Sequence, residues 1–269
     1  MRKVHTQAGV VAYEDIGQGS TVVLLHATLH DHRDFEPIIP ALAKEHRVVA
    51  IDWPGHGESD AHSAVTAALL ADVLQEIVTT LELEPAVIIG NSVGGFAAAR
   101  LAIEHPDRVA GLVLVNTGGF IKPSPLTRIV CRTLGTPSIA RRMAPVEIRS
   151  YMKATSENDK AVIARVQQTA KTPSGIQTFT SLWRSFNDPG YDLRERADQI
   201  KAPTLIVWGS RDPVLPLRFG KTTHKAIPGS RLEVLKTGHL VFSSAPQDFL
   251  EIVEPFIRSA HDRPIARGA

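Results

Sequence analysis

One stretch constrains the fold of this chain more than any other: residues 88–95 read Ile-Ile-Gly-Asn-Ser-Val-Gly-Gly. An apolar, β-branched run leads into a serine flanked by glycines, and the Ala-rich sequence that follows favours a helix. This is the G-x-S-x-G pattern of a nucleophile elbow, a tight strand-to-helix turn that lifts a serine hydroxyl above a parallel sheet. Gly90 and Gly94 suit such a turn because a side chain at either position would collide with the neighbouring strand or helix. The pattern predicts Ser92 as a nucleophile, against the alternative of a loop serine that caps a helix.

Length and composition limit the class of protein. With 269 residues, of which 43% are hydrophobic, the chain can form one large α/β domain or a core with an insertion. Its formal net charge of +2 is too small to indicate nucleic acid or an anionic membrane as a partner. The single cysteine, Cys131, excludes an internal disulfide framework and suits a reducing compartment. Because neither a signal-peptide segment nor a membrane-spanning apolar window is present, we expect a soluble, cytoplasmic protein.

Strand and helix signals alternate along the chain. β-Branched and apolar runs predict strands at Val10–Glu14, Thr21–His26, Arg47–Trp53, Ala86–Gly90, Val109–Asn116, Thr204–Trp208 and Arg231–Leu235. Helical spacing of apolar residues predicts helices at Phe35–Ala43, Ser63–Leu83, Val93–His105, Pro216–Ile227 and Pro246–Ser259, with Ser63 as an N-cap. Several strands are apolar throughout, as in a sheet covered on both faces. The alternation predicts an α/β fold with a mostly parallel, doubly wound sheet.

A proline-rich segment interrupts this alternation once. It reads as short helices with breaks, and it follows one sheet strand and precedes the next. We expect an α/β core of residues 1–118 and 192–269, with residues 119–191 inserted as a helical cap over the carboxyl ends of the strands. Basic residues outnumber acidic ones between residues 119 and 160. Both a surface that attracts an anionic substrate and an ordinary solvated helical surface account for this excess.

A serine hydroxyl is a poor nucleophile at neutral pH, so it needs a base within hydrogen-bond reach and an acid that orients the base. Asp212 directly follows one late strand and His239 directly follows the last one. Asp188 and Asp192 are alternative acids, but neither directly follows a sheet strand. The sequence therefore predicts a catalytic set of Ser92, Asp212 and His239, in that chain order.

With these residues placed, the chain resembles the α/β-hydrolase superfamily over nearly its whole length. The matching motifs are His26-Ala27-Thr28, the turn at 52–60, the elbow, Trp208-Gly209-Ser210-Arg211-Asp212 and Gly238-His239. The resemblance implies an inserted helical cap, with Ser92 as nucleophile, His239 as general base and acid, and Asp212 as the group that fixes the imidazole tautomer. It also implies an oxyanion hole formed by the backbone N–H groups of Thr28 and Val93. The family usually has His-Gly where this chain has His-Ala, but function should survive because the donor is a backbone N–H.

Two narrower resemblances bear on the substrate. The loop at 26–35 is loosely similar to that of enol-lactonases, and the Gly-Asn-Ser-x-Gly-Gly elbow is similar to that of enzymes that cleave carbon–carbon bonds in aromatic-ring degradation. Those enzymes usually carry an aromatic residue after the catalytic histidine, where this chain has Leu240. We expect Leu240, His30 and the cap residues Trp183 and Phe186 to contact the substrate.

Metal and nucleotide cofactors are not expected. His26, His30 and His32 lie close together, but their loop has no nearby cysteine or second group of ligands. Neither a G-x-G-x-x-G pattern nor a P-loop lysine is present.

The sequence thus predicts a cofactor-free serine hydrolase that cleaves a carboxylic ester or a lactone through an acyl-enzyme. The same residues would also serve a C–C bond hydrolase or an acyltransferase. A ligand-binding receptor that retains the triad is a third hypothesis, from a different class. The expected partner is a small-molecule substrate, with neither nucleic acid nor a membrane involved.

Overall fold

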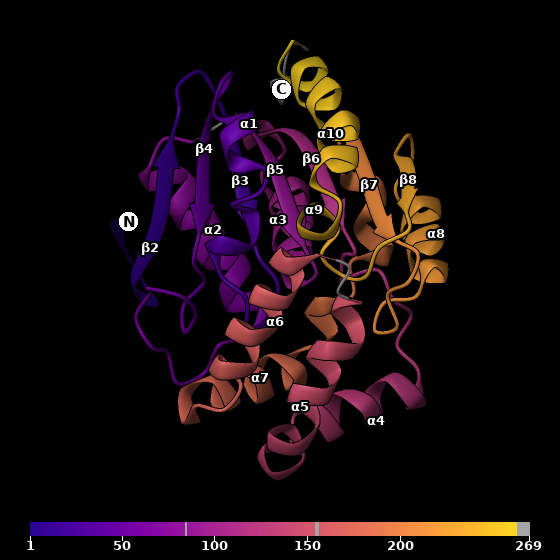
Figure 1. The fold of residues 1–269 in the computed structure, drawn as a ribbon. Helices are drawn as coiled ribbons and strands as arrows, with labels where there is room; N and C mark the ends of the chain where they lie inside the picture. The colour runs from indigo at the N-terminus through magenta and orange to yellow at the C-terminus, as the bar shows by residue number, and fades with distance from the viewer. Residues whose placement is uncertain (84, 154–155, 263–269) are drawn as a thin grey trace.

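A mostly parallel sheet forms the centre of the molecule. The computed structural model describes residues 1–83, 85–153 and 156–262. The eight strands have the order β1-β2-β4-β3-β5-β6-β7-β8, in which β1, β2 and β4 pair antiparallel and all other neighbours pair parallel (Figure 1). The strands are β1 (Arg2–Thr6), β2 (Gly9–Ile16), β3 (Ser20–Leu25), β4 (His46–Ile51), β5 (Ala86–Asn91), β6 (Val109–Val115), β7 (Thr204–Gly209) and β8 (Arg231–Leu235). This arrangement confirms the predicted α/β fold class.

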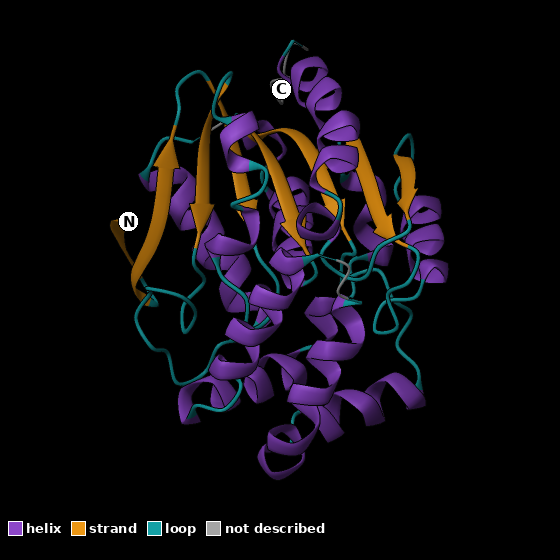
Figure 2. Ribbon diagram, in the orientation of Figure 1, coloured by secondary structure: helices purple, strands orange, loops and turns teal. Residues whose placement is uncertain are grey.

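Helices cover both faces of the sheet and one of its edges (Figure 2). The α-helices are α1 (Ile39–Leu42), α2 (Ala67–Thr80), α3 (Val93–Glu104), α4 (Pro125–Leu134), α5 (Pro137–Met152), α6 (Glu157–Thr169), α7 (Pro173–Ser185), α8 (Leu217–Ala226), α9 (Val241–Ser244) and α10 (Pro246–His261). Short 3-10 helices are η1 (His32–Phe35), η2 (Pro106–Arg108), η3 (Pro189–Tyr191) and η4 (Arg194–Gln199). In the described part of the chain, no helix has the length and apolar character needed to cross a membrane.

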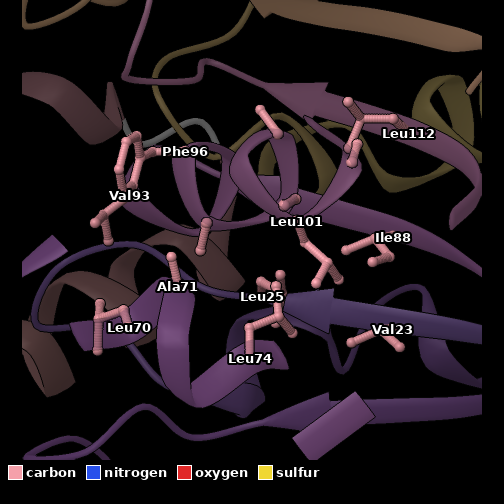
Figure 3. Close-up of a cluster of buried hydrophobic side chains, with 14 of the residues drawn as sticks. Val23, Leu25, Leu70, Ala71, Leu74, Ile88, Val93, Phe96, Leu101 and Leu112 are labelled. Atoms are coloured by element: carbon pink, nitrogen blue, oxygen red, sulfur yellow. The ribbon is translucent and has the colours of Figure 1, made fainter. Parts of the chain in front are cut away.

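The alternation of side chains along the strands builds two cores. In β3, Val23 and Leu25 belong to a buried cluster with residues of α2 and α3, part of which Figure 3 shows. Val22 and Leu24 belong to a second cluster, which includes residues of α1 and α10. Because successive side chains of a strand point to opposite faces, a strand that is apolar throughout must be covered on both sides.

Among the described residues, four α-helices lie between β6 and β7 in the chain, and we call these helices, α4–α7, the cap helices. They gather at the edge of the sheet where the parallel strands end (Figure 1). The core and cap ranges expected from the sequence include residues 84, 154–155 and 263–269, which lie outside the described residues.

Two local predictions were wrong, and one strand was not predicted. Helix α2 begins after Thr66, whose side chain accepts a hydrogen bond from Leu69 N, and not at Ser63. The helix expected at 35–43 is a 3-10 turn followed by one short helix, because Pro37 and Pro40 lack the N–H groups of a continuous helix. Strand β1 was not predicted; it is short and buries only Val4.

Candidate active site

The turn between β5 and α3 has the geometry of an elbow. Ser92 has φ 56° and ψ −115°, a conformation that costs a non-glycine residue about 1–3 kcal/mol. A side chain on Gly90 would collide with the carbonyl of Gly94. A Cβ on Gly94 would lie 2.5 Å from the carbonyl oxygen of Leu25, at the end of β3. The two glycines therefore allow β5, α3 and β3 to approach closely around the serine.

Backbone hydrogen bonds hold Ser92 in this conformation. Its N–H donates to Val115 O at 3.1 Å, and its carbonyl accepts from Phe96 N at 3.2 Å and from Gly118 N at 3.0 Å. The elbow is thus fixed to the end of β6 as well as to α3. Val93, the next residue, contributes one of the first-turn N–H groups that a helix leaves without an intrahelical partner.

The loop after β3 approaches the same helix end. Gly94 packs against the carbonyls of Leu25 and His26, so the first turn of α3 lies beside this loop. Thr28 is half-buried in the loop, within a turn closed by the hydrogen bond from His30 N to Ala27 O at 3.2 Å. The N–H groups of Thr28 and Val93 therefore come from segments that pack against each other.

The predicted base and acid form a buried pair. His239 Nδ1 lies 2.5 Å from Asp212 Oδ2, and the two residues are only 5% and 3% exposed. Because an ionised carboxylate only accepts hydrogen bonds, this contact assigns the proton to Nδ1 and leaves Nε2 free to accept one. Asp188 and Asp192, the alternative acids, lie elsewhere: Asp188 is exposed, and Asp192 pairs with Arg194 at 2.6 Å.

Asp212 is held as an anion by several donors. Its Oδ1 accepts from Val214 N at 2.8 Å and from Leu215 N at 3.0 Å, and its Oδ2 also accepts from Asn116 Nδ2 at 2.6 Å. Burial pushes the pKa of Asp212 upward, but the charge and hydrogen bond of His239 and the bonds from Leu215 and Asn116 outweigh it, so the pKa lies below its usual value.

Asn116 is a residue that sequence reasoning missed. It follows β6 with φ 39°, and its Oδ1 accepts from Gly209 N at 2.8 Å while its Nδ2 donates to Asp212. The side chain therefore ties the acid to the ends of β6 and β7. The signal available in the sequence was its position in the turn that directly follows a sheet strand.

A second asparagine joins the histidine loop to the elbow. Asn91, immediately before Ser92, donates from Nδ2 to Val115 O at 3.0 Å and to His239 O at 3.2 Å. The structure thus brings the loops of Ser92, His239 and Asp212 together where β5, β8 and β7 end.

The cap contacts the histidine loop directly. His239 N donates to Tyr151 O at 2.9 Å, and the two rings meet edge to face with centroids 5.3 Å apart. A side chain on Gly238 would collide with the carbonyls of Tyr151 and Met152. The C-terminal end of α5 is therefore packed against the loop that carries the base.

Tyr151 also binds His30. Tyr151 Oη lies 2.8 Å from His30 Nε2, while His30 Nδ1 lies 2.5 Å from Asp34 Oδ2. Arg165 of α6 completes the contact, with its side-chain nitrogens 2.5 Å from Asp34 Oδ1 and 3.1 Å from Asp31 Oδ2. Both ring nitrogens of His30 are thus occupied by protein groups in a buried network that joins the cap to the core.

The other three residues expected to contact the substrate, Trp183, Phe186 and Leu240, pack against apolar side chains. Trp183 and Phe186 lie in a row of rings that continues through Tyr191 to Phe96 of α3, with successive centroids 5.4, 4.7 and 4.7 Å apart. Leu240 is fully buried in the second core cluster.

The remaining histidines of the β3 loop also have protein partners. His26 Nδ1 donates to Ala27 O at 2.7 Å and its Nε2 accepts from Trp53 N at 3.0 Å, while burial lowers its pKa to about 3, so the ring is neutral. His32 Nδ1 lies 2.9 Å from Asp52 Oδ1. Across residues 1–83, 85–153 and 156–262, no group of three histidine, cysteine, aspartate or glutamate side chains could hold a metal ion.

One more titratable group near the pair was not predicted. Glu147 of α5 has a buried Oε2 for which the described residues provide no hydrogen-bond partner. Burial raises the pKa of Glu147 to about 7, with the charge of His239 lowering it and that of Asp212 raising it. No pattern in the sequence indicates this, because Glu147 falls among the many charged residues of the cap.

The family model of the alpha/beta hydrolase fold matches residues 20–246. The chain belongs to this family. The match runs from β3 to the start of α10 and includes Ser92, Asp212 and His239.

Relatives within the α/β-hydrolase family include two kinds of hydrolase. The chain is 29% identical to 3-oxoadipate enol-lactonase 1 of Acinetobacter baylyi over 230 residues, which cover 85% of each chain. It is 28% identical over 265 residues to the 2-hydroxy-6-oxononadienedioate/2-hydroxy-6-oxononatrienedioate hydrolase of Escherichia coli, with 92% of this chain and 90% of the relative covered. The crystal structure of an enol-lactonase from Burkholderia xenovorans shares the fold with a TM-score of 0.84 at 24% identity, covering 96% of this chain and 100% of the other.

Proposed function

We propose that this α/β-hydrolase is a cofactor-free serine hydrolase that cleaves a carboxylic ester or a lactone. The observation that carries the proposal is the buried His239–Asp212 pair, 2.5 Å apart, beside a serine in the strained elbow conformation. A serine, an imidazole and a carboxylate in these roles form the machinery of acyl transfer.

The proposed reaction begins when Ser92 Oγ attacks the carbonyl carbon and His239 Nε2 takes the hydroxyl proton. The N–H groups of Thr28 and Val93 stabilise the negative charge that develops on the carbonyl oxygen. His239 then gives its proton to the leaving alcohol, and an acyl-enzyme remains on Ser92. A water molecule that loses its proton to His239 attacks this ester and releases the acid. Throughout, Asp212 keeps the imidazole in the required tautomer and stabilises the imidazolium.

The activities of the relatives favour this class and also a second candidate. An enol-lactonase acts on a lactone, which supports ester or lactone cleavage here. The hydrolase relative from Escherichia coli is similar over a comparable length, and it favours a C–C bond hydrolase built on the same triad. Both candidates use Ser92 and His239, so they differ in the substrate and not in the catalytic residues.

A panel of p-nitrophenyl esters, lactones and vinylogous diketones tests the proposal. The wild-type chain should turn over esters or lactones with a higher kcat/KM than vinylogous diketones, and Ser92→Ala should abolish this turnover. Turnover of the diketones alone would replace the proposal with the C–C hydrolase. Activity that survives in Ser92→Ala would reject both. Ile16→Ala is a suitable control, because Ile16 lies on β2, outside the cap, with 41% of its surface exposed.

A further inference from the structure

Glu147 lies on the face of α5 that packs over the candidate triad. It precedes Tyr151 by one helical turn, and residues four apart share a face of a helix. The backbone carbonyl of Tyr151 accepts the His239 N–H at 2.9 Å, and its ring meets the His239 ring. The carboxyl of Glu147 is close enough to His239 and Asp212 for both charges to act on it.

Apart from Tyr151, the buried face of α5 is apolar. The buried side chains of α5 besides Tyr151 are Ala140, Ala144, Ile148 and Met152. Glu147 Oε2 is buried without a hydrogen-bond partner among the described residues, although the side chain as a whole is not fully enclosed. One carboxyl oxygen is thus enclosed by protein, while part of the side chain remains accessible to solvent.

A buried carboxyl oxygen without a partner is costly. Leaving such a group unsatisfied destabilises the folded protein, and an apolar residue on this helix face would avoid that cost. Most buried polar groups in native structures have partners, so an unpaired one beside reacting groups indicates a ligand that supplies the missing bond.

We propose that Glu147 is a specificity-determining residue that accepts a hydrogen bond from a hydroxyl or N–H group in the alcohol portion of the substrate. This inference rests on the proposed serine hydrolase function. The alcohol portion is the relevant part because His239 must deliver its proton to the leaving oxygen, so groups beside the His239 ring lie on the leaving-group side. The same carboxyl disfavours a carboxylate there, since two like charges in a buried site repel each other.

The pKa of Glu147 agrees with this role. Burial raises it to about 7, so near neutral pH the group is divided between an ionised form, which accepts hydrogen bonds, and a neutral form, which also donates one. Only the ionised form restricts the substrate to hydrogen-bond donors.

Two esters with similar leaving-group reactivity test the proposal: 2-hydroxyethyl butanoate and 2-methoxyethyl butanoate, the second of which is larger by one methylene unit. They differ in whether the alcohol portion can donate a hydrogen bond. A site that binds a substrate hydroxyl discriminates strongly against the analogue without it, so at pH 8 the wild-type ratio of kcat/KM should be at least about tenfold in favour of the hydroxy ester. In Glu147→Leu the ratio should fall to near one. Glu147→Gln, which keeps a weaker neutral acceptor, should lower it severalfold.

Glu157→Gln is the matched control, because Glu157 also lies on a cap helix but its side chain is 89% exposed. It should keep the wild-type ratio. A wild-type ratio near one, or a preference that persists in both Glu147 variants, would overturn the proposal and leave Oε2 as a group satisfied by water. If Glu147→Leu does not fold, the kcat/KM ratio of Glu147→Gln alone tests the proposal. Labelling of Ser92 by a fluorophosphonate distinguishes a failure of the Glu147 role from a failure of the serine hydrolase function. Normal labelling with no hydroxyl preference rejects only the role of Glu147, whereas no labelling rejects the serine hydrolase itself.

Discussion

The backbone N–H of His239 donates a hydrogen bond to the carbonyl oxygen of Tyr151 at 2.9 Å. The candidate base is therefore held from two sides, by Asp212 at its ring and by the end of cap helix α5 at its backbone. The hydroxyl of the same tyrosine lies 2.8 Å from His30, in the loop that carries Thr28. One cap residue thus connects the histidine loop with the loop of the proposed oxyanion hole.

Asp212→Asn should impair catalysis less than His239→Ala does. An amide can hold the imidazole ring, but it favours the wrong tautomer and does not stabilise the imidazolium, which costs roughly ten-thousandfold in kcat in a related geometry. Loss of the base itself costs about a millionfold in a comparable enzyme. Steady-state kinetics of the two variants on one ester shows which variant loses more of its kcat. Near wild-type activity in Asp212→Asn would show that another group orients His239.

Asn116→Asp should weaken both stability and activity. The variant keeps the shape of the side chain and tolerates its positive φ, but a carboxylate replaces the Nδ2 donor that binds Asp212 Oδ2 at 2.6 Å. Two adjacent carboxylates repel, so the pKa of Asp212 should rise. Denaturant unfolding should show a loss of about 1–3 kcal/mol, with kcat lowered at neutral pH. Unchanged kcat together with unchanged stability would mean that Asn116 does not support the acid.

Glu147→Gln should stabilise the protein more at high pH than at low pH. The folded-state pKa of Glu147 is raised from 4.5 to about 7, so ionisation opposes folding. The free energy of unfolding therefore falls as pH rises from about 4.5 to about 7, and the glutamine variant does not share this loss. Melting temperatures at pH 5 and pH 8 measure the effect, with His239, Asp212 and Tyr151 intact in both proteins. Equal gains in melting temperature at the two pH values would contradict a buried Glu147 carboxyl with a raised pKa.

Trp183→Ala should change the acyl-chain preference if its ring lines the pocket. A hydrophobic pocket discriminates by about 1–3 kcal/mol per methylene, so kcat/KM across a chain-length series should shift tenfold to a few hundredfold. Because the Trp183 ring packs edge to face against Phe186, which stacks on Tyr191, the variant should also melt at a lower temperature. A lower melting temperature with an unchanged chain-length profile would assign these rings to the packing between the cap and α3.

Much of the fold was predictable because its signals are local. The β5 run, the glycines around Ser92 and the apolar spacing of α3 lie within one short segment, and each limits the local backbone on its own. Asp212 and His239 were found by their positions directly after strands. Asn116, Tyr151 and Glu147 were not, since their importance depends on distant contacts: Asn116 meets an acid 96 positions away, and Tyr151 meets His30 121 positions away. No periodicity or spacing encodes how the cap helices pack on the core.

Labelling with a fluorophosphonate, which reacts only with an activated serine, tests the proposed nucleophile most directly. Intact-mass measurement of the wild-type protein should show one adduct, which peptide mapping places on Ser92. His239→Ala should react far more slowly, and Ser92→Ala should carry no adduct. A wild-type protein that stays unlabelled, or an adduct that forms equally in Ser92→Ala, would contradict the assignment of Ser92 as the nucleophile.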